Sequence, residues 1–537
     1  AVGQGALGAS TTASYNTAVG REALGASTTG TANTAMGQSA GITQTTASGC
    51  TFIGTNAGRT NNTNDNVAVG QGALYSNTTG QYNTAVGPGQ YGVTQGPLGS
   101  NTTGAYNTAV GAKALLGNTT GIKNTAVGTN ALLVNTADGN VAVGYDAVQA
   151  NTSGTGVVAV GPWCLQGNTT GSFNTAVGRS GLYANTTGAC NTAMGRNALS
   201  SNTTGNDNTA LGIYAIGANT TASRNVGVGN SALAAATTGG ENTAVGEQAL
   251  KSLTTGTLNT ALGRHALTKQ TTASNNTAIG AYAMRYNNNA TGCVAVGLEA
   301  LRGTSDGTPL SGNYNTAVGR SALKINTTGN ENTALGANAG DGCTTGYRNI
   351  YVGRDAANTH ATGYAGVYVG ENCESSSTSV DVENVFGAGI TGKGTQTTFV
   401  GGTNGAYNNA NSSSWQTTSD RRIKKNITNN TTGLDKINQI TVRNFEYKTE
   451  DEIKTDNPEL TDVVKSAVVD AEGLQVGSIA QEIEEVLPDV VNTNEMGIKS
   501  VNTDNLTWYL INAVKELSTK NDELAAEIAS LKSQINN

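Results

Sequence analysis

The chain has 537 residues, among them 72 glycines and 6 prolines, and a formal net charge of −7. The glycines follow no G-X-Y period and prolines are scarce, which excludes a collagen-like chain and a Pro-rich linker. The negative charge argues against nucleic acid as the main partner, and the sequence has no run of about 18 apolar residues. We therefore expect neither nucleic-acid binding nor membrane insertion.

The charged residues divide the sequence in two. Residues 1–418 carry 17 Lys and Arg and 16 Asp and Glu, whereas residues 419–537 carry 13 and 21. So sharp a change in composition predicts a domain boundary near residue 419. The chain opens inside its repeated motif, at "AVGQGAL", so we expect further sequence before residue 1.

A 17-residue repeat fills residues 1–370, which we call the shaft. The motif N-T-A-V-G supplies 22 anchor glycines between Gly3 and Gly370, most of them 17 residues apart. The full unit reads N-T-A-V-G-x-x-A-L-x-x-N-T-T-G-x-x. So short a unit buries almost nothing alone and must stack on its neighbours. The sequence therefore predicts a mostly β protein, built as a parallel β-solenoid with one coil per unit.

Each unit contains an expected strand, T-A-V, and an expected turn, N-T-T-G. Asn and Gly adopt positive φ angles at low cost, which suits a turn. Asparagines stacked on one another are expected to form hydrogen-bonded ladders. The core should consist of Ala, Val and one Leu per coil, and so small an apolar volume favours association between chains along the shaft.

The repeat resembles the N-[ST]-x-[AV]-[IV]-G repeats of trimeric autotransporter adhesin heads. That family forms left-handed parallel β-rolls in a homotrimer, so the resemblance implies a β-roll homotrimer for residues 1–370. The period of 17 is longer than is usual in those heads, which makes the N-T-T-G turn look like an enlarged loop.

Two segments of the shaft are longer than one unit, residues 88–100 and residues 302–312. Loops on a solenoid project from one face and often carry recognition. Tyr91 and Asp306 are the candidate receptor-loop residues, since tyrosine makes good contacts with sugars and proteins. The alternative is that both segments are tolerated surface loops.

Metal and cofactor sites are not expected. The six cysteines form no C-x-x-C pair and there are only two histidines, so we expect no zinc site. A glycan-degrading tailspike is an alternative reading of a β-solenoid, and it would need two carboxylates at a defined separation. The acidic residues of the shaft are instead scattered singly along the repeat.

The repeat fades after Gly370. Residues 371–418 are predicted to be a neck or linker with a short strand near Val385, and the Asn/Ser-rich residues 408–414 are typical of a flexible link. Beyond the neck, residues 441–449 alternate as a strand, and residues 479–491 form an amphipathic helix that stops at Pro488.

Residues 506–535 are predicted to form a long helix with a heptad seam of about four heptads. Position d holds Leu510, Leu517, Leu524 and Leu531, and position a holds Val514, Asn521, Ile528 and Ile535. Asn521 is the kind of single polar residue that fixes the register of a coiled coil. Ile at a with Leu at d favours two strands, so the heptads alone do not predict a trimer.

Three motifs follow in order after residue 418: "SDRRIKKNI" (419–427), "GSIAQEIEEVLP" (477–488) and "LTWYLINAVKEL" (506–517). Together they resemble the intramolecular chaperone domain of phage tail fibres and endosialidases, which is classed as peptidase S74. The resemblance covers residues 419–537. It implies a small α+β domain that ends in a trimeric coiled coil, holds β-rich fibres in register while they fold, and then cuts itself off.

The same resemblance implies a serine–lysine dyad that acts only on its own chain. Ser419 would be the nucleophile, Lys424 its base, and the peptide bond between Thr418 and Ser419 the one that is cut. A serine hydroxyl needs a base to become a nucleophile. A lysine acts as that base when burial or neighbouring cations lower its pKa.

Neighbouring residues have possible supporting roles. Arg421, Arg422 and Lys425 crowd Lys424 with positive charge, and the two arginines could also steady an oxyanion. Asn426 could donate a hydrogen bond to it. Some domains of this type retain the fold without cutting, and then Ser419 would be only a helix cap.

These observations favour a structural and receptor-recognition protein, the tail fibre of a phage virion. Its expected partners are two further copies of itself, a host cell-surface glycan or protein receptor, and other virion tail proteins that bind through the sequence before residue 1. The alternatives are a bacterial trimeric surface adhesin with the same chaperone and a glycan-degrading tailspike.

Overall fold

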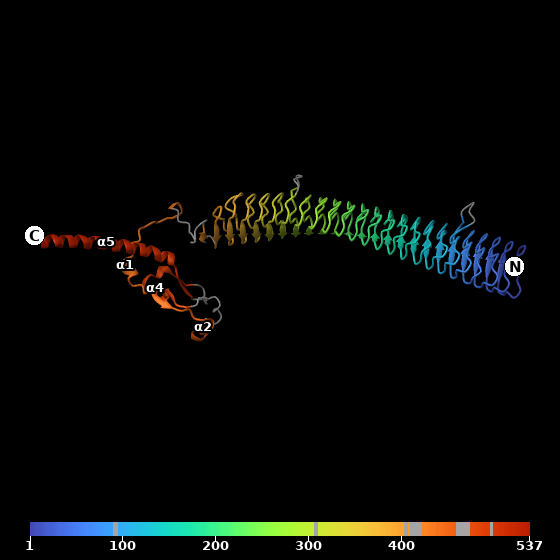
Figure 1. Ribbon diagram of the computed structural model, residues 1–537, viewed down its shortest axis with the longest axis horizontal. Coiled ribbons are helices and arrows are strands. Elements are labelled where there is room, and N and C mark those ends of the chain that lie inside the picture. The colour runs from blue at the N-terminus through green and yellow to red at the C-terminus, as the bar shows by residue number, and fades with distance from the viewer. Residues whose placement is uncertain are drawn as a thin grey trace. The chain divides into compact units, whose positions relative to one another are not determined.

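The computed structural model describes residues 1–89, 95–304, 310–401, 406–408, 421–457, 473–493 and 498–536. The chain divides into two compact units, Ala1–Thr417 and Thr418–Asn537. Figure 1 shows the ribbon of both, coloured along the chain.

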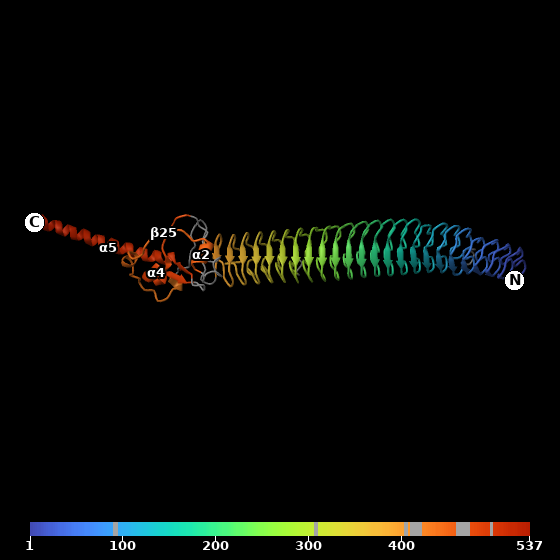
Figure 2. The same cartoon turned by 90° about the horizontal axis from the view of Figure 1, so that it is seen from below.

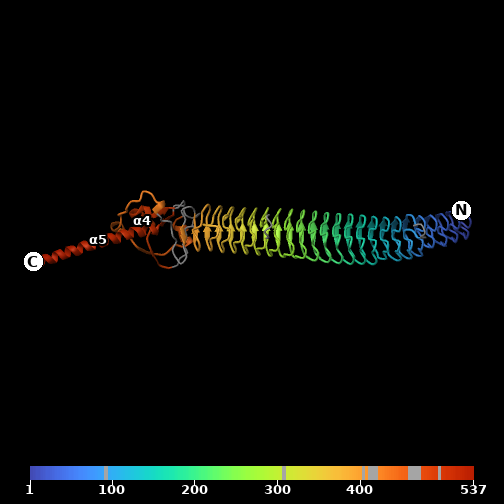
Figure 3. The ribbon, with the colours of Figure 1, turned by 90° about the horizontal axis from the view of Figure 1, so that it is seen from above.

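The N-terminal unit is a parallel β-solenoid, as predicted. Each strand has three residues and pairs in register with the strand of the next coil, so that Thr17 lies beside Thr34 and Ala18 beside Ala35. Figures 2 and 3 show these strands as one row along the unit. The strands are β1 (Thr17–Val19), β2 (Thr34–Met36), β3 (Thr51–Ile53), β4 (Val67–Val69), β5 (Thr84–Val86), β6 (Thr108–Val110), β7 (Thr125–Val127), β8 (Val141–Val143), β9 (Val158–Val160), β10 (Thr175–Val177), β11 (Thr192–Met194), β12 (Thr209–Leu211), β13 (Val226–Val228), β14 (Thr243–Val245), β15 (Thr260–Leu262), β16 (Thr277–Ile279), β17 (Val294–Val296), β18 (Thr316–Val318), β19 (Thr333–Leu335), β20 (Ile350–Val352), β21 (Val367–Val369), β22 (Asn384–Phe386), β23 (Thr398–Val400) and β24 (Ala406–Asn408).

The middle residue of each strand points into the solenoid. Ala18 is 1% exposed, and the Ala and Leu of the x-x-A-L segment, such as Ala23 and Leu24, are fully buried. The residues on either side of the middle Ala face outward, and Leu335 is 51% exposed. The prediction that Val belongs to the core is therefore wrong. Strand alternation puts the first and third residues on the same face, and the narrow interior accepts only the small middle residue.

The anchor glycine of each coil cannot be replaced without strain. Gly195 has a φ of +133°, and a Cβ there would lie 2.6 Å from the carbonyl oxygen of Gly212 in the next coil. The other positive φ angles of this coil fall on Asn197, Leu199 and Asp207. The expectation that the Asn and Gly of the N-T-T-G turn take positive φ is wrong, because the coil reverses direction at these other positions.

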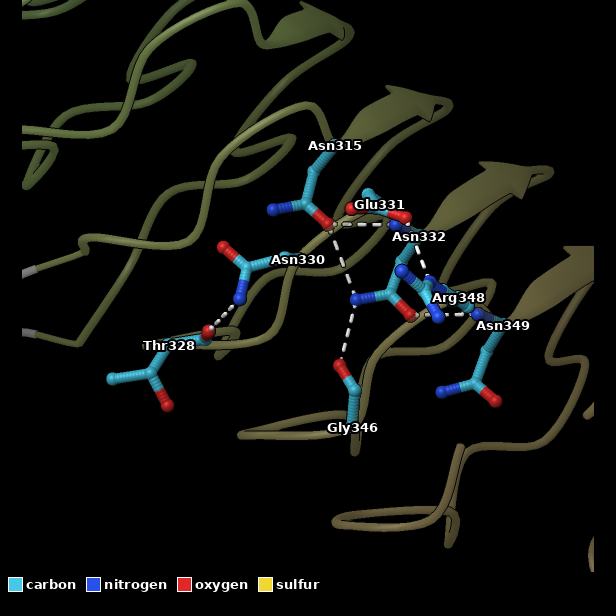
Figure 4. Close-up of polar contacts among 8 residues, drawn as sticks. All are labelled: Asn315, Thr328, Asn330, Glu331, Asn332, Gly346, Arg348 and Asn349. Carbon is cyan, nitrogen blue, oxygen red and sulfur yellow. Dashed lines mark hydrogen bonds and ion pairs between the residues drawn. The ribbon is translucent and has the colours of Figure 1, made fainter. Parts of the chain in front are cut away.

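Buried asparagines form two ladders along the solenoid, as predicted. In Figure 4 the main-chain N–H of Asn332 donates to Oδ1 of Asn315 at 2.9 Å, and Nδ2 of Asn332 donates to the carbonyl oxygen of Gly346 at 2.7 Å. A second ladder joins successive N-T-T-G turns, where Nδ2 of Asn168 donates to Oδ1 of Asn151 at 2.9 Å. Each side chain thus satisfies buried polar groups of two coils.

The stack continues past Gly370, where the sequence period fades. β22 and β23 pair in parallel with the strand before each, and β24 adds an antiparallel strand at this edge of the sheet. The buried middle residue is larger toward this end of the solenoid, at Tyr351 and Tyr368 just before Gly370 and at Phe399 after it. The parallel coils reach Val400, beyond the end of the shaft that the repeat motif marks.

Both over-length segments return to the ordinary coil. Leu98 is fully buried at the leucine position of its coil. Main-chain N–H groups of Gly303 and Leu310 donate to neighbouring coils at 2.9 and 3.4 Å, so the extra residues of the second segment lie between them. Tyr91 and Asp306 lie outside the described residues, and their recognition role stays a prediction.

All six cysteines are free thiols, and all but Cys190 are buried. Burial raises the pKa of Cys50, Cys164 and Cys293 to about 11. These thiols are therefore neutral and act as small packing groups.

The C-terminal unit has a small α+β fold. Its elements are the 3₁₀ turn η1 (Arg421–Ile423), α1 (Leu434–Ile437), β25 (Arg443–Phe445), α2 (Glu450–Asp456), β26 (Gln475–Gly477), α4 (Ala480–Val486), the 3₁₀ turn η3 (Pro488–Val490), β27 (Val491–Thr493), β28 (Lys499–Val501) and α5 (Thr503–Ile535). β25 pairs antiparallel with β26, and β27 with β28. Ile483, Leu487, Val490 and Tyr509 form the core. The helix expected to stop at Pro488 is α4, and the long helix is α5.

Candidate self-cleavage site and assembly surfaces

The residues after the predicted cut form a short exposed turn. In η1 the main-chain N–H of Lys424 donates to the carbonyl oxygen of Arg421 at 3.2 Å. Lys424, Arg421, Arg422 and Asn426 are all exposed. Asn426 has a φ of +54°, a left-handed conformation that asparagine adopts more easily than most residues. This conformation is a structural reason for Asn at 426, separate from any role toward an oxyanion.

Thr418 and Ser419 lie outside the described residues. The pairing of Ser419 with Lys424, and the support expected from Arg421, Arg422 and Asn426, therefore stay predictions. What the structure does describe is how the segment after the turn is held.

That segment is tied to the long helix α5. Nδ2 of Asn512 donates to the carbonyl oxygens of Asn430 and Thr432, at 2.8 and 3.2 Å. The main-chain N–H of Leu434, at the start of α1, donates to a carboxylate oxygen of Glu516 at 2.9 Å. Three consecutive contacts thus fix the chain downstream of η1 against one helix.

A close main-chain approach completes this anchor. A Cβ on Gly433 would lie 2.6 Å from the main-chain nitrogen of Ala513, so only glycine fits against the helix. Ala513 is 2% exposed beneath it. Since Asn512, Ala513 and Glu516 all belong to the "LTWYLINAVKEL" motif, this motif holds the segment that follows the "SDRRIKKNI" motif.

The second motif, "GSIAQEIEEVLP", supplies the platform for α5. Ile483 of its helix α4 and Leu487, which directly follows that helix, are buried in one cluster with Tyr509 of α5. The hydroxyl of Tyr509 donates to Asp489, and this hydrogen bond, together with burial, raises the pKa of Tyr509. Nζ of Lys499 lies 2.6 Å from both carboxylate oxygens of Glu484 and links β28 to α4.

The heptad seam of α5 is uncovered in the single chain. Its apolar members are exposed by about half or more: Leu510 50%, Val514 58%, Leu517 47%, Leu524 54%, Ile528 51%, Leu531 50% and Ile535 82%. A helix of 33 residues with one such stripe is typical of a coiled-coil strand.

An apolar groove continues this seam at the start of α5. It has a volume of about 310 Å³ and is lined by Ile437, Ile440, Val442, Thr503, Leu506, Thr507 and Leu510. Thr503 and Leu510 are one heptad apart on position d, and Thr507 is on position a. The uncovered seam therefore extends into the body of the C-terminal unit.

Comparison with protein families matches the C-terminal part of the chain. Residues 419–492 match the family described as chaperone of endosialidase. The match begins at the predicted nucleophile Ser419 and includes the first two motifs. It supports a C-terminal chaperone domain, as the resemblance implied. No curated protein and no solved structure matches the chain.

The described parts of the chain hold neither a metal cluster nor a membrane-spanning helix. No group of three or more His, Cys, Asp and Glu is placed to hold a metal ion there. Within the same residues, no helix is both long enough and apolar enough to cross a bilayer.

Sequence reasoning missed the residues that anchor the cleavage segment. Asn512 and Glu516 bind main-chain atoms some 80 residues earlier in the chain, and a main-chain partner leaves no residue-type signal. Gly433 was the one residue in the sequence that could have indicated this contact, because a glycine between polar residues and an apolar helix often marks close main-chain packing.

Proposed function

We propose that the chain is a trimeric tail-fibre protein of a phage, whose C-terminal domain directs assembly and then releases itself at the bond between Thr418 and Ser419. The observation that carries this proposal is the family match of residues 419–492, which starts at the proposed nucleophile. The match concerns a chaperone, and a chaperone needs a client that is hard to fold. A long parallel solenoid, whose equivalent coils must align in several chains, is such a client.

The outward row of the sheet supports the trimer. The third residue of each strand is apolar, and it faces outward along β1 to β23. Met36, Met194, Leu211, Leu262 and Leu335 in this row are between 42% and 51% exposed. Exposed apolar surface this continuous is typical of an interface. We assign it, together with the seam of α5, to contacts between copies of the chain.

The proposed cut is an attack by Ser419 on the carbonyl carbon that precedes it. The Oγ–C bond forms, the C–N bond to the nitrogen of Ser419 breaks, and the Oγ proton passes by way of Lys424 to the leaving amine. Water then hydrolyses the resulting ester, which leaves a carboxylate on Thr418 and restores the serine hydroxyl. Because this second step is hydrolysis, release after assembly is irreversible in practice.

The location and the external partners follow from this role. The released shaft would remain on the virion as part of its tail fibre, attached to other tail proteins, and would bind a host surface receptor. A bacterial surface adhesin would use the same modules. The match to an endosialidase chaperone favours the phage fibre.

Light scattering on the purified Ser419→Ala protein tests the assembly half of the proposal. The chain mass is 54.2 kDa, and we expect an assembled mass three times as large. A monomer at micromolar concentration would refute the trimer, and a dimer would assign the seam of α5 to a two-stranded coil instead.

A further inference from the structure

One stretch of the solenoid has an excess of positive charge. Residues 251–324 carry seven Lys and Arg but only two Asp and Glu, whereas the rest of residues 1–418 carries 10 and 14. The seven are Lys251, Arg264, Lys269, Arg285, Arg302, Arg320 and Lys324. All of them fall within the six residues that follow an anchor glycine, so they lie on one side of the solenoid. Arg285, Arg302 and Lys324 occupy the same position of three consecutive coils, spaced by about 4.8 Å per coil.

Tyrosine rings hold three of these cations in place. The guanidinium carbon of Arg285 lies 5.1 Å from the ring centre of Tyr282 and 5.0 Å from that of Tyr286. Arg264 lies over Tyr282 at 5.7 Å, and its Nη1 donates to the hydroxyl of Tyr282 at 2.8 Å. Arg302 lies 6.0 Å from the ring of Tyr286. Such contacts fix the guanidinium groups before any ligand arrives, which lowers the entropy cost of binding.

Arg285 lacks the acidic partner that its neighbours have. Arg302 and Lys324 share Glu299, at 2.8 and 3.1 Å, and Arg264 pairs with Glu247 at 3.3 Å. Burial raises the pKa of Glu299, but hydrogen bonds from Lys324 and Arg302 outweigh it and hold that pKa below its usual value. Arg285 forms no ion pair with any carboxylate of the described residues, and its Nε is buried without a hydrogen-bond partner.

From this geometry we propose that Arg285, with Arg302, Lys324 and Arg264, forms a binding site for a carboxylate-bearing polysaccharide that lies along the shaft. The planar guanidinium of Arg285 offers a fork that matches one carboxylate. The cations of the next two coils provide further contacts for an extended anionic chain. The proposal rests on the receptor-recognition role proposed above and assigns that role to a named surface and a ligand class.

The position of the second over-length segment fits this assignment. That segment leaves the coil directly after Arg302 and Gly303, so it starts next to the middle member of the cationic row. The tyrosine rings are already covered by cations, and His265 stacks on Tyr282 with ring centres 5.4 Å apart. Little free ring surface is left to stack on bases or neutral sugars. Recognition at this surface is therefore by charge.

Binding of polygalacturonate, a carboxylated polysaccharide, to the purified assembled protein tests the site. We expect wild-type protein to bind it and to ignore neutral dextran, with Arg285→Ala weakening the binding by about tenfold or more. Arg285→Lys, which retains the charge but not the fork, should show an intermediate loss. The matched control is Arg348→Ala, because Arg348 is exposed on another part of the coil and already paired with Glu331 at 2.8 Å (Figure 4).

Several results would overturn the site. They are equal binding of dextran, equal loss in Arg348→Ala and Arg285→Ala, unchanged binding in Arg285→Ala, or binding of an oligo-dT strand with the same affinity and the same dependence on Arg285. Light scattering on the same samples separates the two proposals. If the protein is a trimer but does not bind polygalacturonate, the binding site is refuted and the assembly is not. If the protein is a monomer, the assembly is refuted, and the binding measurement still tests the site independently.

Discussion

Asn512, in the first third of α5, donates its side-chain amide to the main-chain carbonyl of Asn430, 2.8 Å away, and so joins the coiled-coil helix to the segment just after the predicted cut. The two residues are 82 positions apart in the sequence. If the proposed cleavage depends on assembly, this is a physical route for the coupling, since ordering of α5 fixes the position of the chain that follows Lys424.

Asn512→Ala should slow self-cleavage without preventing assembly. The substitution removes two hydrogen bonds to the exposed carbonyls of Asn430 and Thr432, each worth about 0.5–1.5 kcal/mol, and loosens the segment that bears Lys424. We expect the cleavage rate to fall by about tenfold, followed on denaturing gels over time. Asn505→Ala on the same helix is the control and should cut normally. If both variants cut at the wild-type rate, the anchor does not position the site.

Acidic substitutions in the outward row of the sheet should weaken association between chains but should not destabilise the solenoid of the single chain. Leu211→Glu and Leu262→Glu replace side chains that are 46% and 47% exposed in the single chain. Each leucine buried between chains contributes about 1.5–3 kcal/mol, so the double variant should dissociate at far higher concentration than wild type. Analytical ultracentrifugation measures this. Leu258→Glu, at 54% exposure on a turn, is the matched control. Equal effects of all three changes would place the interface elsewhere.

Gly195→Ala should destabilise the shaft, whereas Gly181→Ala should not. At Gly195 the φ is +133° and the added Cβ would meet a carbonyl oxygen at 2.6 Å, which we expect to cost ~2 kcal/mol or more. At Gly181 the added Cβ would make only ordinary contacts, the nearest 3.4 Å from Sγ of Cys164. That site is the alanine position of other coils, so a gain of ~0.5 kcal/mol is expected. Thermal unfolding would distinguish the pair, and equal midpoints would contradict this account of the anchor glycine.

Acid should loosen the last coils of the shaft through His360. Its Nε2 donates to the carbonyl oxygen of Val380 at 2.9 Å, and its Nδ1 lies 2.9 Å from the hydroxyl oxygen of Tyr351. Burial lowers the pKa of His360 below the ordinary value of 6.5. The unfolded coils then bind a proton that the folded coils exclude. Stability is therefore complete above about pH 6.5 and is lost as the pH falls below it.

Hydrogen exchange at pH 7.5 and pH 5.5 measures this effect locally. Amides of residues 340–383 should exchange faster relative to the rest of the solenoid at the lower pH. His360→Asn, which restores the ladder residue of other coils, should remove the difference. An unchanged pH response in that variant would show that another group is responsible.

The 17-residue period was sufficient to predict the parallel coil, because short units with one leucine can bury surface only by stacking. Alternation along the strand shows that the Thr and Val side chains share a face. It does not show whether that face points into the solenoid or outward, so the outward position of Val could not be predicted. That choice depends on the width of the interior, set by the buried Ala and Leu rows of neighbouring coils. The last coil of the solenoid could not be located from the sequence motif either. Tyr368 and Phe399 replace the small middle residue of the motif, although the strands there keep the same geometry. At the cleavage site, Asn512 and Glu516 were invisible because their partners are main-chain atoms.

Intact mass of the purified wild-type protein, compared with Ser419→Ala, Lys424→Ala and Lys425→Ala, tests the central claim of a self-releasing chaperone. Alanine at 419 removes the proposed nucleophile, and alanine at 424 removes the proposed base, while the neighbouring arginines stay protonated. We predict pieces corresponding to residues 1–418 and 419–537 from wild type and from Lys425→Ala, and one uncut chain from the other two variants. Cleavage that survives Lys424→Ala but is lost in Lys425→Ala would contradict the dyad, and an uncut wild-type chain would contradict self-release itself.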